Sequence, residues 1–178
     1  MKKNFEMFRA SARELGNVRT LSVAAMLTAL TAILGFFTIV IGDFIKIQFS
    51  FLSMGVAASM FGPVVSGILG GLSDIIAFMI KPTGTFFPGF TLNAVISGTI
   101  YGIFFYNKKI SVKRIFVAQL LITLIVELGL STLWLDILYG QGFLAILPMR
   151  IVKSAVMLPI NTAMLYIVIS KISFLFKK

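Results

Sequence analysis

The sequence contains no cysteine and no histidine and has few charged residues. Without cysteine and histidine the chain has no disulfide, no thiol nucleophile, no imidazole base and none of the usual zinc sites. Charged residues make up 12% of its 178 residues, whereas an ordinary soluble domain carries about 25%. So few charges cannot cover a soluble globule. The composition therefore excludes a soluble enzyme, a disordered chain and a disulfide-rich secreted domain.

What the chain has instead is apolar sequence, with 58% hydrophobic residues and a mean hydropathy of +1.02. A transmembrane helix takes about 20 residues, so a chain of this length has room for several crossings and no separate soluble domain. We expect an all-α integral membrane protein with one membrane domain over 1–178. Breaks between the apolar runs predict a bundle of six transmembrane helices, with a tight reversal at Gly62-Pro63. The expected segments are a basic N-terminal segment at 1–19 and spans at about 20–41, 47–61, 63–80, 88–106, 115–135 and 149–176.

The basic residues predict the orientation of these spans. Six spans place both termini on one side, and twelve of the sixteen basic residues fall on that side. The positive-inside rule then places both termini in the cytoplasm, and the net charge of +10 is explained by anionic lipid rather than by nucleic acid. The segment 1–19 is either an amphipathic helix on the inner surface or a solvated tail.

Polar residues inside the spans concentrate toward the outer half of the bundle. Ionisable groups at such depth are costly and usually functional, and two of them, Asp74 and Glu127, lie within spans. The last span carries Arg150, Lys153 and Asn161 on one helical face, and the fourth carries a stripe that begins at Asn93. These residues form either a site open to the outside or pairs and snorkelling side chains that only stabilise the bundle.

Aromatic residues gather in the loops expected on the outer side, at Phe86, Phe87, Trp134 and Tyr139. They are typical of an interfacial belt, and they equally suit stacking on a planar ligand.

Three pairs of small residues, each four residues apart, predict close helix contacts. They are Ala25 with Ala29, Gly67 with Gly71, and Gly98 with Gly102. Such a pair serves internal packing unless it faces lipid, where it would dock another membrane subunit. The sequence does not distinguish the two.

The chain carries no phosphate-binding loop and no aspartate-rich magnesium motif. Gly62 and Gly67 have the spacing of such a loop, but Ile68-Leu69 follow where Lys-Ser or Lys-Thr is required. An enzyme is therefore weakly supported, no metal or cofactor is expected, and uphill transport would need ATP hydrolysis on a partner.

These features resemble the substrate-binding S components of energy-coupling factor (ECF) vitamin transporters. The size, the six spans, the inner termini and the Ala25-x-x-x-Ala29 pair are similar to that family. The stretch 86–102, with Phe86-Phe87-Pro88-Gly89-Phe90-Thr91-Leu92-Asn93, and the start of the last span at 148–160 resemble the folate-specific members.

The resemblance implies that the chain binds a vitamin, here folate, from outside a bacterial cell. It also implies docking through Ala25 and Ala29 onto a transmembrane coupling subunit that carries two ATP-binding subunits. The alternative hypotheses are an S component for another vitamin such as riboflavin or thiamine, and a small membrane enzyme acting on a lipid or prenyl diphosphate.

For a folate ligand, the candidate residues follow from the chemistry of its parts. A carboxylate suits the adjacent ring N–H and amine of a pterin, aromatic rings suit its flat faces, and cations suit its dianionic glutamate tail, with Arg150 as the first choice. The loop 42–50 is expected to act as a gate. The predicted substrate-binding residues are Asp43, Lys46, Asp74, Lys81, Thr85, Phe86, Phe87, Asn93, Trp134, Asp136, Tyr139, Arg150, Lys153 and Asn161.

Overall fold

The computed structural model describes residues 2–41, 45–82, 85–140 and 142–176. Within them the chain is almost entirely helical, with a short two-stranded hairpin. Five helical segments are long and apolar enough to cross a membrane. The elements in chain order are α1 (Lys2–Glu14), α2 (Val18–Phe36), β1 (Thr38–Ile41), β2 (Ile45–Gln48), α3 (Ser50–Ile80), α4 (Pro88–Phe105), α5 (Val112–Ile122), the π-helical η1 (Thr123–Leu130), α6 (Ser131–Tyr139) and α7 (Phe143–Phe176).

The long helix α3 is bent back on itself at Gly62. This glycine has φ 84° and ψ −173°, a conformation open to glycine and strained for other residues, and Pro63 follows as the first residue of the second arm. A Cβ built on Gly70 would lie 3.0 Å from Met54 Cε, although sixteen residues of straight helix would separate the two by about 24 Å. The two arms therefore run antiparallel, as the Gly62-Pro63 sequence predicts for 47–61 and 63–80.

The first span differs from its expected range, 20–41. The helix α2 ends at Phe36, and the chain continues into β1, which pairs antiparallel with β2 in the register Thr38 to Gln48 and Ile41 to Ile45. The paired segments are rich in isoleucine and valine, which favour strands. The prediction of helix to residue 41 was therefore wrong, because periodicity alone does not distinguish helix from strand in an apolar run of this kind. The predicted loop at 42–50 also contains a strand, β2.

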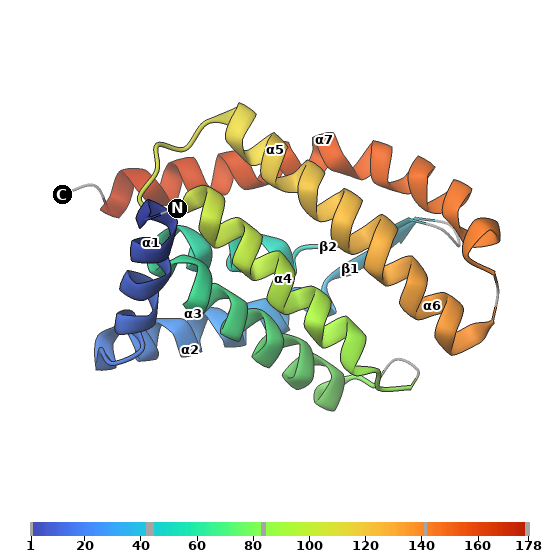
Figure 1. The fold of residues 1–178 in the computed structure, drawn as a ribbon, viewed down its shortest axis with the longest axis horizontal. Helices are drawn as coiled ribbons and strands as arrows, with labels where there is room; N and C mark the ends of the chain where they lie inside the picture. Colours follow the sequence, from blue (N-terminus) through green and yellow to red (C-terminus); the bar gives the residue numbers. More distant parts are fainter. Residues whose placement is uncertain (1, 42–44, 83–84, 141, 177–178) are drawn as a thin grey trace.

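The two ends of the bundle carry different groups of elements (Figure 1). At one end, here called the terminal end, lie α1, the C-terminal part of α7 and the connection from α4 to α5. At the other, here called the hairpin end, lie the end of β1 and the start of β2, the C-terminal end of α3, the end of α6 and the start of α7. The first helix, α1, and the C-terminal part of the last helix, α7, thus share one end of the bundle.

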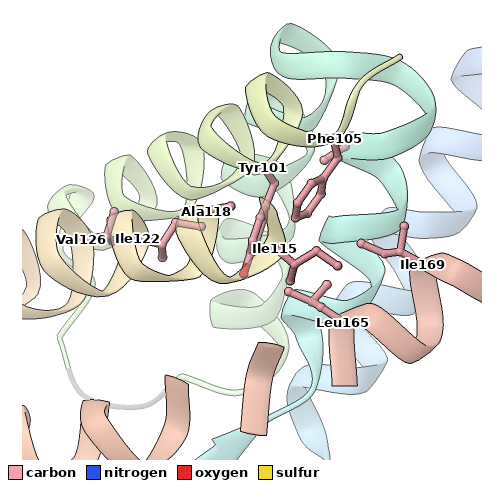
Figure 2. Packing of buried hydrophobic residues seen from close by; sticks show 9 residues of the cluster. Tyr101, Phe105, Ile115, Ala118, Ile122, Val126, Leu165 and Ile169 are labelled. Atoms are coloured by element: carbon pink, nitrogen blue, oxygen red, sulfur yellow. The ribbon is translucent and has the colours of Figure 1, made fainter. Parts of the chain in front are cut away.

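An apolar cluster packs α4, α5 and α7 together toward the terminal end. Tyr101 and Phe105 stack at 5.4 Å and project from α4 toward Ile115 and Leu165 (Figure 2). Both isoleucine and leucine side chains are fully buried. Burying a side chain of this size stabilises a protein by about 1.5–3 kcal/mol. This apolar cluster therefore holds α4, α5 and α7 together near the terminal end of the bundle.

Most of the predicted segment 1–19 forms α1 (Lys2–Glu14), which is fixed to the bundle rather than a solvated tail. Ser11 of α1 is fully buried. Its hydroxyl donates to the Phe61 carbonyl at 2.6 Å and accepts from the N–H groups of Val64 and Val65 at 3.1 and 3.3 Å. These are the backbone groups that the break at Gly62 removes from regular helix pairing. Ser11 therefore completes the reversal of α3.

Replacing Ser11 with alanine is expected to lower the free energy of unfolding by about 1–3 kcal/mol, because it leaves buried backbone groups without a partner. Thermal unfolding of the purified protein in detergent measures the effect. Ser22→Ala is the matched control, since the exposed Ser22 hydroxyl bonds only the Val18 carbonyl of its own helix and should cost little. Equal melting temperatures for the two variants would contradict this role of Ser11.

Candidate functional site

A cavity of about 650 Å³ lies inside the bundle. Pockets of this size bind small organic ligands. Its walls come from α2, both arms of α3, α4, the continuous α5–η1 segment and α7. The lining residues are Thr31, Ala32, Gly35, Ser50, Phe51, Met54, Gly70, Ser73, Asp74, Ala77, Phe78, Lys81, Asn93, Ala94, Ser97, Tyr101, Gln119, Ile122, Val126, Glu127, Lys153, Met157 and Asn161.

Charged side chains of both signs line this cavity. Asp74 on α3 and Glu127 on η1 are the acidic groups, and Lys81 and Lys153 are the basic ones. The Asp74 carboxylate accepts a hydrogen bond from Thr91 Oγ1 at 2.7 Å, so a neighbouring helix holds it in place. A cavity that combines apolar walls with a few ionisable groups of both signs suits a small organic ligand that carries charged or polar groups.

Neutral polar groups line the cavity near the apolar cluster of α4, α5 and α7. Tyr101 OH donates to Gln119 Oε1, which joins α4 to α5. Asn161 Oδ1 is buried and has no hydrogen-bond partner among the described residues. Because leaving a buried acceptor unpaired costs about 1–3 kcal/mol, Asn161 is a natural point for a ligand donor.

The side chain of Asn93 is held in the cavity wall by two groups of the α5–η1–α6 segment. Its Oδ1 accepts from Trp134 Nε1 at 3.1 Å, and its Nδ2 donates to Ser131 Oγ at 2.9 Å. Trp134 therefore acts on the site through Asn93 and does not line the cavity itself. Its indole also packs on Phe87, with ring centroids 5.4 Å apart.

The aromatic side chains that line the cavity are not the ones expected from the sequence. Phe86 is exposed and packs against Phe78 at 5.1 Å, and neither Phe86 nor Phe87 lines the cavity. Phe51 and Phe78 do, together with Tyr101. Phe51 lies at the start of α3, Phe78 near its end and Tyr101 within α4. Their positions in the sequence give no signal that separates a site residue from ordinary packing.

The other predicted residues fall into three groups. Asp74, Lys81, Asn93, Lys153 and Asn161 come together in the lining of the cavity. Thr85, Asp136 and Arg150 lie outside it: Thr85 is exposed, Asp136 Oδ1 caps the turn before α7 by accepting from Gly142 N at 2.9 Å, and Arg150 bonds backbone and side chain of the neighbouring helix. Asp43 lies outside the described residues, and the side chains of Lys46 and Tyr139 are likewise not described, although Lys46 is placed on β2.

The small-residue pairs separate into internal and exposed ones. Gly67 and Gly71 on α3 face α4, where Gly98 and Gly102 allow backbone contact. In contrast, Ala25 and Ala29 are exposed on α2, whose buried side carries Ala24, Thr28 and Ala32. Leu21, Met26, Leu30 and Ile33 extend this exposed apolar surface.

Glu127 and Gln119 line the cavity, but they were not among the predicted site residues. The signal for Glu127 was present, since an acidic residue inside a span is rarely structural. Its place on a helix face could not be read from spacing, because the π-helical turn changes that face.

Comparison with known proteins gives the chain's relatives. Residues 19–169 match the family described as "ECF transporter, substrate-specific component". The folate transporter FolT of Clostridium novyi (strain NT) is 46% identical over 122 residues, covering 68% of this chain and 71% of that protein. FolT of Leuconostoc mesenteroides subsp. mesenteroides is 33% identical over 160 residues, covering 86% of each chain. A crystal structure of FolT bound with folic acid superimposes with a TM-score of 0.81 at 31% identity, covering 91% of this chain and 96% of that one.

Proposed function

The chain belongs to the substrate-specific components of ECF transporters, and we propose that it captures folate from outside the cell for ATP-driven uptake. It is a multi-pass membrane protein and a transport subunit, not an enzyme. The observation that carries the proposal is the charged cavity of about 650 Å³ in a fold that matches the folic-acid-bound FolT over 91% of the chain.

The cavity residues suit the parts of folate by their chemistry. Asp74 and the unpaired Asn161 Oδ1 are hydrogen-bond acceptors for N–H groups of the ligand. Phe51 and Phe78 give apolar faces for the aromatic rings. Lys81 and Lys153 supply cations for the glutamate carboxylates, and Lys81 lies beside the C-terminal end of α3, at the hairpin end of the bundle.

The proposed orientation places the terminal end in the cytoplasm and the hairpin end outside. The basic residues toward the terminal end support it: two groups of four, on α1 and at 108–114, with Arg19 at the start of α2 and Lys171 near the end of α7. Folate then enters at the hairpin end, past the β-hairpin. The proposed location is the bacterial cell membrane, in line with bacterial relatives.

The exposed face of α2 around Ala25 and Ala29 is the proposed contact with a transmembrane coupling subunit. Small residues on an exposed transmembrane face allow a partner helix to approach closely. The two ATP-binding subunits act through that coupling subunit, since this sequence carries no phosphate-binding loop.

The proposal predicts that the purified protein binds folate in detergent with 1:1 stoichiometry. Isothermal titration calorimetry measures it, with mass spectrometry of any copurified ligand as the second readout. A copurified flavin, with no heat from added folate, would overturn folate in favour of riboflavin. Asp74→Asn is expected to weaken binding about tenfold, or about 1.4 kcal/mol, and Asp136→Asn, outside the cavity, is the matched control.

A further inference from the structure

Glu127 is an acidic side chain well inside a membrane-crossing segment, Val112–Leu138, and it lines the ligand cavity. Its Oε2 accepts a hydrogen bond from the buried Ser154 Oγ at 3.3 Å. Ionisable groups in such a setting are costly to bury and usually serve a function. The function proposed above does not use this group.

The turn that carries Glu127 is π-helical. The Ser131 N–H, which in an α-helix would bond the Glu127 carbonyl, bonds the Val126 carbonyl instead. In an α-helix, the face that carries Gln119, Ile122 and Val126 would continue at position 129 or 130. The wider turn brings position 127 onto this face as well, beside Val126 in the cavity wall.

Arg150 holds this turn from the neighbouring helix. Its Nη1 donates to the Glu127 carbonyl at 3.3 Å and to Thr132 Oγ1 at 3.2 Å, and Thr132 is fully buried. The first acceptor belongs to the π-helical turn and the second to α6, so Arg150 joins the two segments where one passes into the other. Arg150 does not line the cavity, so its contacts point to a role in shaping the wall rather than in touching a ligand.

We propose that Arg150 is a positioning residue that fixes the π-helical turn, and that this turn presents the Glu127 carboxylate to the adjacent N–H donors of a 2-amino-4-oxopteridine ring. The inference rests on the proposed folate function and assigns its pterin-recognising group. Two parallel hydrogen bonds to a carboxylate are strong and directional. Asp74 is less suited, because its carboxylate already accepts a bond of 2.7 Å from Thr91, while the bond from Ser154 to Glu127 is long.

A direct contact between Arg150 and the glutamate tail makes a different prediction, and the ligand's own parts separate the two. Pteroate has the pterin and the benzoate but no glutamate. If Arg150 acts through Glu127, Arg150→Met weakens folate and pteroate by the same factor. If it binds the tail, Arg150→Met weakens folate and leaves pteroate unchanged.

The experiment is calorimetric titration of the full-length protein in detergent with folate, pteroate and a folate analogue whose 2-amino group is replaced by oxygen. We expect Glu127→Gln and Arg150→Met each to weaken folate and pteroate about tenfold, and the double variant to be no weaker than either single one, because both changes remove one interaction. Glu127→Gln should affect the 2-oxo analogue much less. Lys171→Met, an exposed cation near the other end of α7, is the control for loss of charge.

Thr132→Val and Arg150→Lys keep the test decisive if Arg150→Met does not fold. The valine removes one acceptor of Arg150 and should reproduce part of the loss, whereas lysine keeps a donor for the Glu127 carbonyl and should restore part of the affinity. Additive effects of Glu127→Gln and Arg150→Met, or a loss confined to folate, would overturn the inference while leaving the folate function standing. A wild-type protein that binds neither folate nor pteroate would overturn the function itself.

Discussion

Replacing Ala25 and Ala29 together with tryptophan is expected to reduce folate uptake to background while leaving folate binding unchanged. Both alanines are exposed on α2, and neither lines the ligand cavity. Two indoles on this face would keep a partner helix from approaching closely, which is what small residues in a membrane interface provide. The cavity wall of α2, at Thr31, Ala32 and Gly35, lies beyond the substituted turns.

Uptake is measured with labelled folate in cells that also produce the coupling and ATP-binding subunits, and binding by calorimetry on the purified variant. The matched control is tryptophan at Ala155 and Ala163, two exposed alanines of α7, which should leave uptake intact. Persistent uptake in the α2 variant would reject the docking face. Loss of binding together with uptake would mean that this face supports the bundle itself.

The small-residue pairs show where sequence reasoning stops. In the sequence, Ala25-x-x-x-Ala29 and Gly98-x-x-x-Gly102 are equivalent signals for close helix contact. In the structure, one faces outward and the other faces α3 at backbone contact. Spacing gives the helix face on which a pair lies, but only the packing of all helices decides whether that face is covered.

The helical, multi-pass character of the chain was predictable because an apolar run of about 20 residues has few alternatives in a chain with so few charges. The reversal of α3 was predictable for a local reason, the adjacent Gly62 and Pro63. The β-hairpin was not, because Thr38–Ile41 continues the apolar run of α2 without a polar break. The end of a helix inside such a run depends on pairing with a later segment, here Ile45–Gln48.

For the site, depth along a span did not decide which of the predicted polar side chains line the cavity, because Lys81 and Lys153 near span ends also line it. Asp74, Asn93 and Asn161 line the cavity, as the cost of burying polar groups in a bilayer suggests. Arg150 was read from its helical spacing with Lys153 and Asn161, yet it bonds the Glu127 carbonyl. The sequence could not show this acceptor, because the carbonyl is exposed to Arg150 by a π-helical turn that has no simple sequence signature.

The contact between α3 and α4 gives the largest expected loss of stability. A Cβ on Gly98 would lie 2.3 Å from the Ser66 carbonyl oxygen and 2.8 Å from its carbon, so even a methyl group requires the two backbones to separate. Separation would also stretch the hydrogen bond of 2.7 Å from Ser66 Oγ to the Gly98 carbonyl. Gly98→Ala is expected to lower the free energy of unfolding by about 3 kcal/mol, the upper part of the usual range for overpacking, and Gly98→Leu to prevent folding.

Thermal unfolding in detergent, with and without folate, tests this expectation. Gly16→Ala, outside the cavity, is the matched control, because a Cβ there would meet only the Arg13 carbonyl oxygen at an ordinary 3.5 Å, and the change should be neutral or slightly stabilising. Gly98→Ala should also weaken folate binding, since Asn93, Ala94 and Ser97 of the same helix line the cavity and move with it. An unchanged melting temperature for Gly98→Ala would mean that α3 and α4 can separate without cost, and that their backbone contact does not hold the cavity wall in place.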